Sequence, residues 1–335
     1  MLLALVITVI IVALIFDFIN GFHDCANAIA TVVSTGVLPL RTAILLAALL
    51  NFVGALTGTA VASTIGKGIL DTGSITLTVV LAALLGAIFW NLVTWYYGIP
   101  SSSSHAMVGG LVGAGFAHSG ASSIHMEGLV KIFVSLVASP LLGMLLGLLL
   151  MISLIWICKR RRPHVVSRVF RVLQMLSAGF MALSHGSNDA QKTMGVITMS
   201  LVAYGAIAAT GGKLEVPLWV VLLSAAAMGL GTAAGGVRII KTLGTKIIDL
   251  KPIHGFAAET AAASVIISAS HFGLPVSTTH VISGSIMGVG ASQRVSAVRW
   301  GVTMRILYAW ILTIPISAIS AALAYYVASA AIGIP

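Results

Sequence analysis

Acidic residues are scarce in this chain. Of its 335 residues only 8 are Asp or Glu, against 18 Lys or Arg, and charged residues of both signs make up 8% of the total. Because 59% of the residues are hydrophobic, too few polar side chains remain to cover a soluble globule of this length. A soluble fold is therefore excluded, and a bilayer is indicated. The 2 cysteines, Cys25 and Cys158, show no metal-ligand spacing and say little about the redox compartment.

Strict alternation of apolar and polar residues is also missing, which excludes a transmembrane β-barrel. The first apolar run has no basic segment before it, so we expect it to be a retained helix and not a cleaved signal peptide. Several runs approach or exceed the roughly 20 apolar residues that span a bilayer as a helix. They are residues 2–16, 43–62, 75–97, 129–157, 216–237 and 300–334. The fold class predicted is an all-α polytopic membrane protein.

The net charge of +10 could suggest nucleic acid, but the basic residues are concentrated in a few segments. Segments 158–171 and 238–251 carry most of them, while other loops hold neutral pairs. By the positive-inside rule the two basic loops are cytoplasmic and both termini lie outside a plasma membrane. The excess charge thus indicates topology, and no nucleic-acid partner is expected. The neutral pairs, predicted to be external, are Lys67 with Asp71, Glu127 with Lys131, and Lys213 with Glu215.

An internal repeat organises the chain. Residues 21–28 (GFHDCANA) resemble 186–193 (GSNDAQKT), and 100–105 (PSSSSH) resemble 275–280 (PVSTTH). Residues 1–157 form the first repeat and 172–335 the second, with the basic segment 158–171 as a cytoplasmic linker. Equivalent loops fall on opposite sides by their charge, so the repeats are inverted, with about five crossings each and broken or re-entrant helices at the centre.

Four polar interruptions break the apolar sequence, at 17–27, 100–105, 184–193 and 275–280. Irregular backbone at membrane depth persists only where it is buried in protein or lines a wet cavity, so we expect one shared central site. Half-helices that begin at Pro100 and Pro275 would point free N–H groups and hydroxyls inward, as an anion cradle. The phosphate-binding residues predicted there are Ser101, Ser102, Ser103, Ser104, Ser277, Thr278 and Thr279, with Asn27 and Lys192 beside them.

Charged residues inside apolar segments need a reason, because each costs roughly 2.5 to 3.5 kcal/mol at the bilayer centre. Asp24 and Asp189 match in the repeat, and we expect them to hold Na⁺ or a shared proton beside the anion, with Asn188 in the same coupling group. No other metal site is expected. Asp17 could instead cap a helix at the membrane interface. Glu259, whose counterpart is Leu84, could carry a cation or proton or be a buried hydrogen-bonded carboxyl.

Two histidines end the hydroxyl runs at equivalent positions. His105 and His280 could be satisfied core residues, or could orient hydroxyls and relay protons. His23, His185 and His271 have weaker claims to a role. The many glycines, such as Gly109, Gly113, Gly284 and Gly288, are expected to allow close helix contact.

At these residues the chain resembles the inorganic phosphate transporter (PiT) family over essentially its whole length. The repeated signature of that family reads G-x-N-D-x-x-N-A. The second copy here keeps Gly186, Asn188 and Asp189, while Lys192 and Thr193 replace Asn and Ala; the first keeps Gly21, Asp24, Asn27 and Ala28, with His23 for Asn. The departures resemble bacterial members. The resemblance implies symport of phosphate, or of a neutral metal–phosphate complex, with Na⁺ or protons, by one group of helices moving against a scaffold.

Three other functions are compatible with parts of the sequence. Another oxyanion such as sulfate fits a tetrahedral cradle, but only a protonated phosphate can donate a hydrogen bond to the acidic pair. Ser104 next to His105 prompts an intramembrane serine hydrolase, but no G-x-S-x-G motif is present and the pattern occurs twice. A passive channel is disfavoured by the paired carboxylates. We therefore expect a transporter and not an enzyme, without a cofactor; the sequence also allows a homodimer.

Overall fold

The structure is a computed structural model, and it describes residues 1–70, 74–207 and 215–332. The described residues are almost entirely helical and contain no strand beyond a single bridge between Leu70 and Ile124. The all-α fold is thus confirmed. The helices are α1 (Leu2–Ser34), α2 (Leu40–Ala55), α3 (Ala60–Gly68), α4 (Leu77–Tyr97), α5 (Ser103–Ser119), α6 (Met126–Cys158), α7 (Pro163–Tyr204), α8 (Leu218–Ala234), α9 (Val237–Thr245), α10 (Pro252–His271), α11 (Thr278–Ala291) and α12 (Trp300–Ile332).

Five of the described helices are long and apolar enough to cross a membrane by themselves: α1, α4, α6, α7 and α12. Two bent pairs, α2 with α3 and α8 with α9, are apolar enough only when taken together, each as a broken span or a re-entrant loop, and the helices of each pair meet at 73°. The bent pairs match in the two halves and supply breaks where polypeptide can leave the helical path. The chain is a multi-pass membrane protein.

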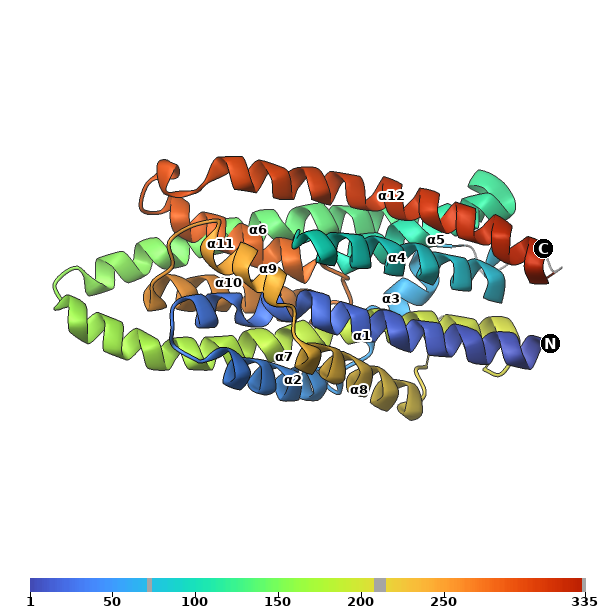
Figure 1. The fold of residues 1–335 in the computed structure, drawn as a ribbon, viewed down its shortest axis with the longest axis horizontal. Coiled ribbons are helices and arrows are strands. Elements are labelled where there is room, and N and C mark those ends of the chain that lie inside the picture. The colour runs from blue at the N-terminus through green and yellow to red at the C-terminus, as the bar shows by residue number, and fades with distance from the viewer. Residues whose placement is uncertain (71–73, 208–214, 333–335) are drawn as a thin grey trace.

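The helices occur in the same order in both halves when each bent pair counts as one unit. The first half contains α1, α2/α3, α4, α5 and α6, and the second contains α7, α8/α9, α10, α11 and α12. Helices α1 and α7 cross the molecule side by side and in opposite directions, as Figure 1 shows. An antiparallel pair of this kind is what inverted repeats require.

The short helices α5 and α11 pack against the long helix that ends the other half, α12 and α6 respectively. A Cβ atom at Gly109 would lie 2.5 Å from the Ile314 carbonyl oxygen of α12, and one at Gly113 would lie 2.5 Å from the Cα of Ala318. Gly284 and Gly288 meet the α6 backbone at Pro140 and Met144 in the same way. The prediction that these glycines allow close helix contact is confirmed.

Two of the four predicted interruptions are not irregular. Residues 17–27 lie inside α1 and 184–193 inside α7, and both helices are continuous there. The polar residues of α1 recur at spacings of 3 and 4, which places them on one helix face where neighbouring helices can supply partners. These residues are Asp17, Asn20, Asp24, Asn27 and Thr31. A polar face of this kind leaves the backbone hydrogen bonds intact.

The other two interruptions are real. Helix α5 begins at Ser103 and α11 at Thr278, three residues after Pro100 and Pro275, where the sequence had suggested that the helices would start. The later start follows from capping. The Ser102 hydroxyl accepts from the backbone N–H of His105 at 3.1 Å, and Ser277 accepts from that of His280 at 3.3 Å.

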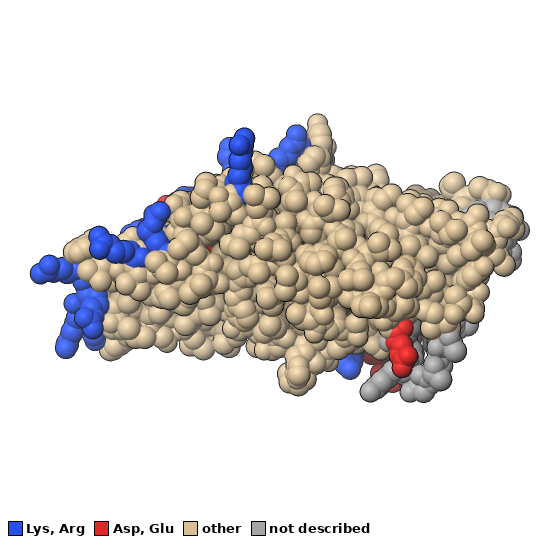
Figure 2. Space-filling model, turned by 90° about the horizontal axis from the view of Figure 1, so that it is seen from below, with Lys and Arg blue, Asp and Glu red and all other residues tan. Residues whose placement is uncertain are grey.

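The basic segments are more helical than the sequence suggested. Segment 158–171 was expected to be a loop, but α7 begins at Pro163 within it, and α9 covers most of the expected loop 238–251. Basic side chains gather at one end of the molecule in Figure 2, the end where α6 and α7 meet in Figure 1. The start of α1 and the end of α12 lie at the opposite end. The expected pairs that involve Asp71 and Lys213 fall outside the described residues.

Candidate substrate site

The N-termini of α5 and α11 meet at the centre of the molecule. The Ser104 hydroxyl of α5 donates to the carbonyl oxygen of Val276, just before α11, at 3.1 Å. The rings of His105 and His280 stack with 4.4 Å between their centroids. All seven predicted hydroxyl residues are at most 5% exposed: Ser101, Ser102, Ser103, Ser104, Ser277, Thr278 and Thr279. Two positive helix ends and their hydroxyls thus converge in a buried region, which suits an anion.

Helix α1 reaches this region through Asn27. The Asn27 side-chain amide donates to the hydroxyl of Thr279 at 2.9 Å and to that of Thr278 at 3.3 Å. Because Thr278 and Thr279 open α11, this contact fixes the first turn of a second-half helix to the first half. Asn27 is fully buried, and its Oδ1 atom accepts no hydrogen bond from any residue that the structure describes.

Helix α7 contributes Asp189 and Lys192. The Lys192 ammonium lies 2.5 Å from Asp189 Oδ1, 2.5 Å from the Ser104 hydroxyl and 2.8 Å from the Val276 carbonyl oxygen. The other Asp189 oxygen accepts from Thr278 at 3.0 Å. Lys192 therefore ties α7 to the residues that open both α5 and α11.

A group of three side chains that could hold a cation lies between α1 and α7. One ligand atom each from Asp24, His185 and Asp189 lie within 4.8 Å of one another, and all three residues are buried. His185 Nε2 is 3.3 Å from Asp189 Oδ2. Two of the three donors are carboxylate oxygens, which are ligands that hard cations accept, so the group is a candidate cation site.

Asp24 also heads a chain of contacts that leads to α5. One of its carboxylate oxygens lies 2.6 Å from His23 Nδ1, and His23 Nε2 lies 3.1 Å from the hydroxyl of Thr94 on α4. Ser101 donates to the same Thr94 hydroxyl at 2.8 Å. The carboxylate of the first half is thereby connected to the hydroxyl run of the same half.

The contacts of Asn188 and Glu259 are with groups other than Asp24 and Asp189. Asn188 donates to Ser270 at 2.8 Å and accepts from the backbone N–H of Val276 at 3.4 Å, so it braces the segment before α11. Glu259 is buried on α10 and accepts from Thr31 at 2.5 Å, from Gln174 at 3.1 Å and from Ser177. It forms a second polar cluster, one helical turn beyond Asn27 along α1.

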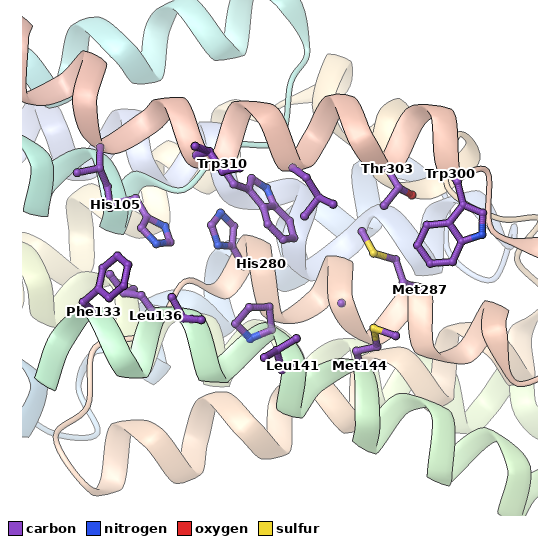
Figure 3. Close-up of a pocket in the computed structure, with 16 residues that line it drawn as sticks. His105, Phe133, Leu136, Leu141, Met144, His280, Met287, Trp300, Thr303 and Trp310 are labelled. Atoms are coloured by element: carbon purple, nitrogen blue, oxygen red, sulfur yellow. The ribbon is translucent and has the colours of Figure 1, made fainter. Parts of the chain in front are cut away.

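The rings of His105 and His280 make no hydrogen bond to a described residue. His280 stacks on Trp310 with 3.8 Å between ring centroids, and Trp310 donates to the Pro100 carbonyl oxygen at 3.1 Å. Figure 3 shows both imidazoles at the wall of an apolar cavity of about 510 Å³ between α6 and α12, next to Trp310 and Leu136. The rings thus separate the hydroxyl runs from this cavity. The Ser104 hydroxyl bonds to Val276 and Lys192, so no pair of Ser104 with His105 is formed.

Several residues at the centre carried little or no signal in the sequence. The sequence gives only weak support for a role of His23 and His185. His185 nevertheless precedes Asp189 by one helical turn and so shares its helix face. His271, the third weak candidate, is exposed and only contacts the Phe272 ring. Asp17 does not cap a helix: it lies inside α1 and is fully buried, and within the described part of the chain neither of its carboxylate oxygens has a hydrogen-bond partner.

Fold and site together define a membrane transporter: a multi-pass helical protein with a buried polar site between discontinuous helices. The model of the phosphate transporter family matches residues 20–321, and the chain belongs to this family.

The chain is similar over 97% of its length to a probable low-affinity inorganic phosphate transporter of Rhizobium meliloti strain 1021, with 51% identity and 96% of that protein covered. A protein of the same description from Bacillus subtilis strain 168 is 49% identical, with 97% of this chain and 98% of that one covered. A solved structure described as the sodium-dependent phosphate transporter matches with a TM-score of 0.87 and 27% identity, covering 97% of this chain and 98% of that chain. The expectation of a transporter and not an enzyme agrees with these descriptions.

Proposed function

We propose that the protein is a secondary transporter that carries inorganic phosphate, alone or as a metal–phosphate complex, across the plasma membrane together with Na⁺ or a proton. The observation that carries the proposal is the meeting of the α5 and α11 N-termini beside Asp24 and Asp189. Phosphate would be held by backbone N–H groups of both first turns and by hydroxyls that do not already donate within the protein, such as those of Ser103 and Thr279, which come from the two sides.

The carboxylates give the reason for coupling. A bare carboxylate repels an anion at short range in a medium of low dielectric constant, so Asp24 disfavours phosphate unless a cation lies between them. A cation at Asp24 removes this repulsion, and by linkage phosphate then strengthens cation binding by the same factor. Phosphate and cation would therefore bind and cross together.

The orientation follows from the charges. With the basic end of Figure 2 facing the cytoplasm, both termini lie outside. Movement of one set of helices against the other would open the site to each side in turn, as the two bent pairs allow.

Uptake of labelled phosphate into proteoliposomes tests the proposal, with Na⁺ and proton gradients imposed separately and sulfate as competitor. We expect at least one gradient to accelerate uptake and to drive accumulation against the phosphate gradient. Asp24→Asn should abolish the response to the effective gradient. The proposal fails if neither gradient matters, and stronger inhibition by sulfate than by unlabelled phosphate would favour the alternative of a sulfate carrier.

A further inference from the structure

The Lys192 ammonium has no hydrogen-bond donor left for a substrate. An ammonium group has three N–H donors, and here they face three oxygens, those of Asp189, Ser104 and Val276, at 2.5 to 2.8 Å. The side chain is only 3% exposed. The oxygens comprise a carboxylate, a hydroxyl and a carbonyl at a helix break, which are the ligand types that hold a hard monovalent cation. The ammonium thus lies where a bound cation would lie.

The first half has the equivalent position but lacks the charge. Asn27 matches Lys192 in the repeat, just as Thr279 matches Ser104. Asn27 donates to Thr279 at 2.9 Å, and Lys192 donates to Ser104, so the two hydrogen bonds are equivalent and both cross between the halves. The oxygens differ in what they contact. Asn27 Oδ1 and the hydroxyl of Ser103 are buried and have no hydrogen-bond partner among the described residues. The oxygens around Lys192, in contrast, already accept hydrogen bonds from its ammonium.

The carboxylates differ in the same way. Asp189 contacts a permanently tethered cation at 2.5 Å, while the hydrogen-bond contact of Asp24 is with His23. A mobile cation is therefore needed near Asp24 but would compete with the ammonium at Asp189.

We propose that the ammonium of Lys192 is a tethered cation that replaces a mobile coupling cation in the second half, so that the mobile cation binds only in the first half, at Asp24 and Asn27. The proposal rests on the proposed cation coupling and assigns Lys192 to the cation side of the site; the sequence had suggested that it binds phosphate. It implies that the positive charge of Lys192 stays bound to the protein through every transport cycle and is never released.

Lys192→Asn gives the second half the residue that the first half has, and so should create a second mobile site. Without Na⁺ this variant leaves the Asp189 carboxylate without its counter-charge, so its thermal midpoint in detergent should be lower than that of wild type. Added NaCl, compared with choline chloride at equal ionic strength, should then raise its midpoint by roughly 2 °C or more beyond the rise seen in wild type. Lys192→Gln provides a second variant with an amide oxygen, and both are checked for folding by size-exclusion chromatography.

Two controls make the result specific. Lys246→Asn removes an exposed lysine of the basic end and should respond to NaCl as wild type does. Lys192→Asn combined with Asp189→Asn should lose the additional Na⁺ response, because the carboxylate ligand is gone. Equal Na⁺ responses in wild type and in both folded Lys192 variants would overturn the proposal. Failure of wild-type uptake to respond to any gradient would instead reject cation coupling, and the midpoint measurement does not depend on transport.

Discussion

The Lys192 ammonium lies 2.5 Å from a carboxylate oxygen of Asp189, which precedes Lys192 by three residues on α7. Both side chains are almost fully buried. Asp24, the counterpart of Asp189 in the other half, contacts the ring of its neighbour His23 at 2.6 Å. Both matched carboxylates therefore contact a histidine ring, but only Asp189 also contacts a lysine ammonium among the described residues. The halves share a backbone plan but differ in charge where the substrate is expected.

The first prediction concerns stability. Asp189→Asn should lower the free energy of unfolding by about 3 to 5 kcal/mol, because it leaves the buried Lys192 ammonium without a counter-charge. Asp24→Asn should cost only about 1 kcal/mol, since the amide can keep the contact with His23. Thermal unfolding in detergent measures both. Asp249→Asn is the control, because its partner Arg299 and Asp249 itself are exposed, and it should shift the midpoint very little. A larger loss in Asp24→Asn than in Asp189→Asn would contradict this reading of the site.

The second prediction concerns substrate affinity. Ser103→Ala and Thr279→Val remove one hydroxyl from each side of the cradle, and neither hydroxyl donates its hydrogen to a described residue. Each should raise the KM for phosphate uptake roughly tenfold while the maximal rate falls much less, because one hydrogen bond to a charged group contributes about 1.5 kcal/mol. Kinetics of labelled-phosphate uptake measure this. Ser122→Ala changes an exposed hydroxyl that bonds only to Ser119, and it serves as the control. An unchanged KM in both cradle variants would show that these hydroxyls do not bind phosphate.

Capping made part of the site predictable from the sequence. Proline followed by Ser or Thr marked both breaks, because a hydroxyl that accepts a backbone N–H starts a helix in any environment. Helices α5 and α11 begin at Ser103 and Thr278 because Ser102 and Ser277 are the residues whose hydroxyls cap them. The sequence offers several hydroxyls at each break, and only the structure shows which one is the cap.

The polar faces of α1 and α7 were misread as breaks for a physical reason. A local window shows polar residues in an apolar run but not the neighbouring helix that satisfies them. Thr31 bonds Glu259 from α10, and His185 joins Asp24 and Asp189 only because α1 and α7 run side by side. Tertiary partners of this kind have no signature in the sequence of one helix.

The third prediction concerns Asp17. Its two carboxylate oxygens are buried and accept no hydrogen bond from a described residue. An unpaired carboxylate in a buried place is destabilising, whereas an amide of the same shape removes the charge. Asp17→Asn should therefore raise the free energy of unfolding, by about 1 kcal/mol, measured as a higher thermal midpoint in detergent.

A matched change separates charge from packing at this position. Asp17→Leu also removes the charge, but it puts an apolar side chain on the same polar face of α1 as Asn20, whose buried Oδ1 has no partner among the described residues. It should therefore be less stable than Asp17→Asn. A lower midpoint for Asp17→Asn than for wild type would show that the carboxylate is needed for stability as it stands.

The fourth prediction concerns the contact between halves. A Cβ atom at Gly113 of α5 would lie 2.5 Å from the Cα of Ala318 on α12, where backbone cannot yield, so Gly113→Ala must push the two helices apart. We expect a loss of roughly 1 to 3 kcal/mol in the free energy of unfolding. Gly288→Ala should cost a similar amount, because its Cβ would meet the Met144 backbone of α6.

The control for this pair is Gly301→Ala on α12, because a Cβ atom there would meet nothing within 4 Å. Alanine favours helix over glycine by roughly 0.5 to 1 kcal/mol, so this variant should be as stable as wild type or more so. Because α5 carries Ser103 and Ser104 at its start, displacing it at Gly113 should also weaken phosphate uptake, whereas Gly301→Ala should leave uptake unchanged. Equal midpoints for Gly113→Ala and Gly301→Ala would mean that α5 and α12 do not pack this closely in the membrane.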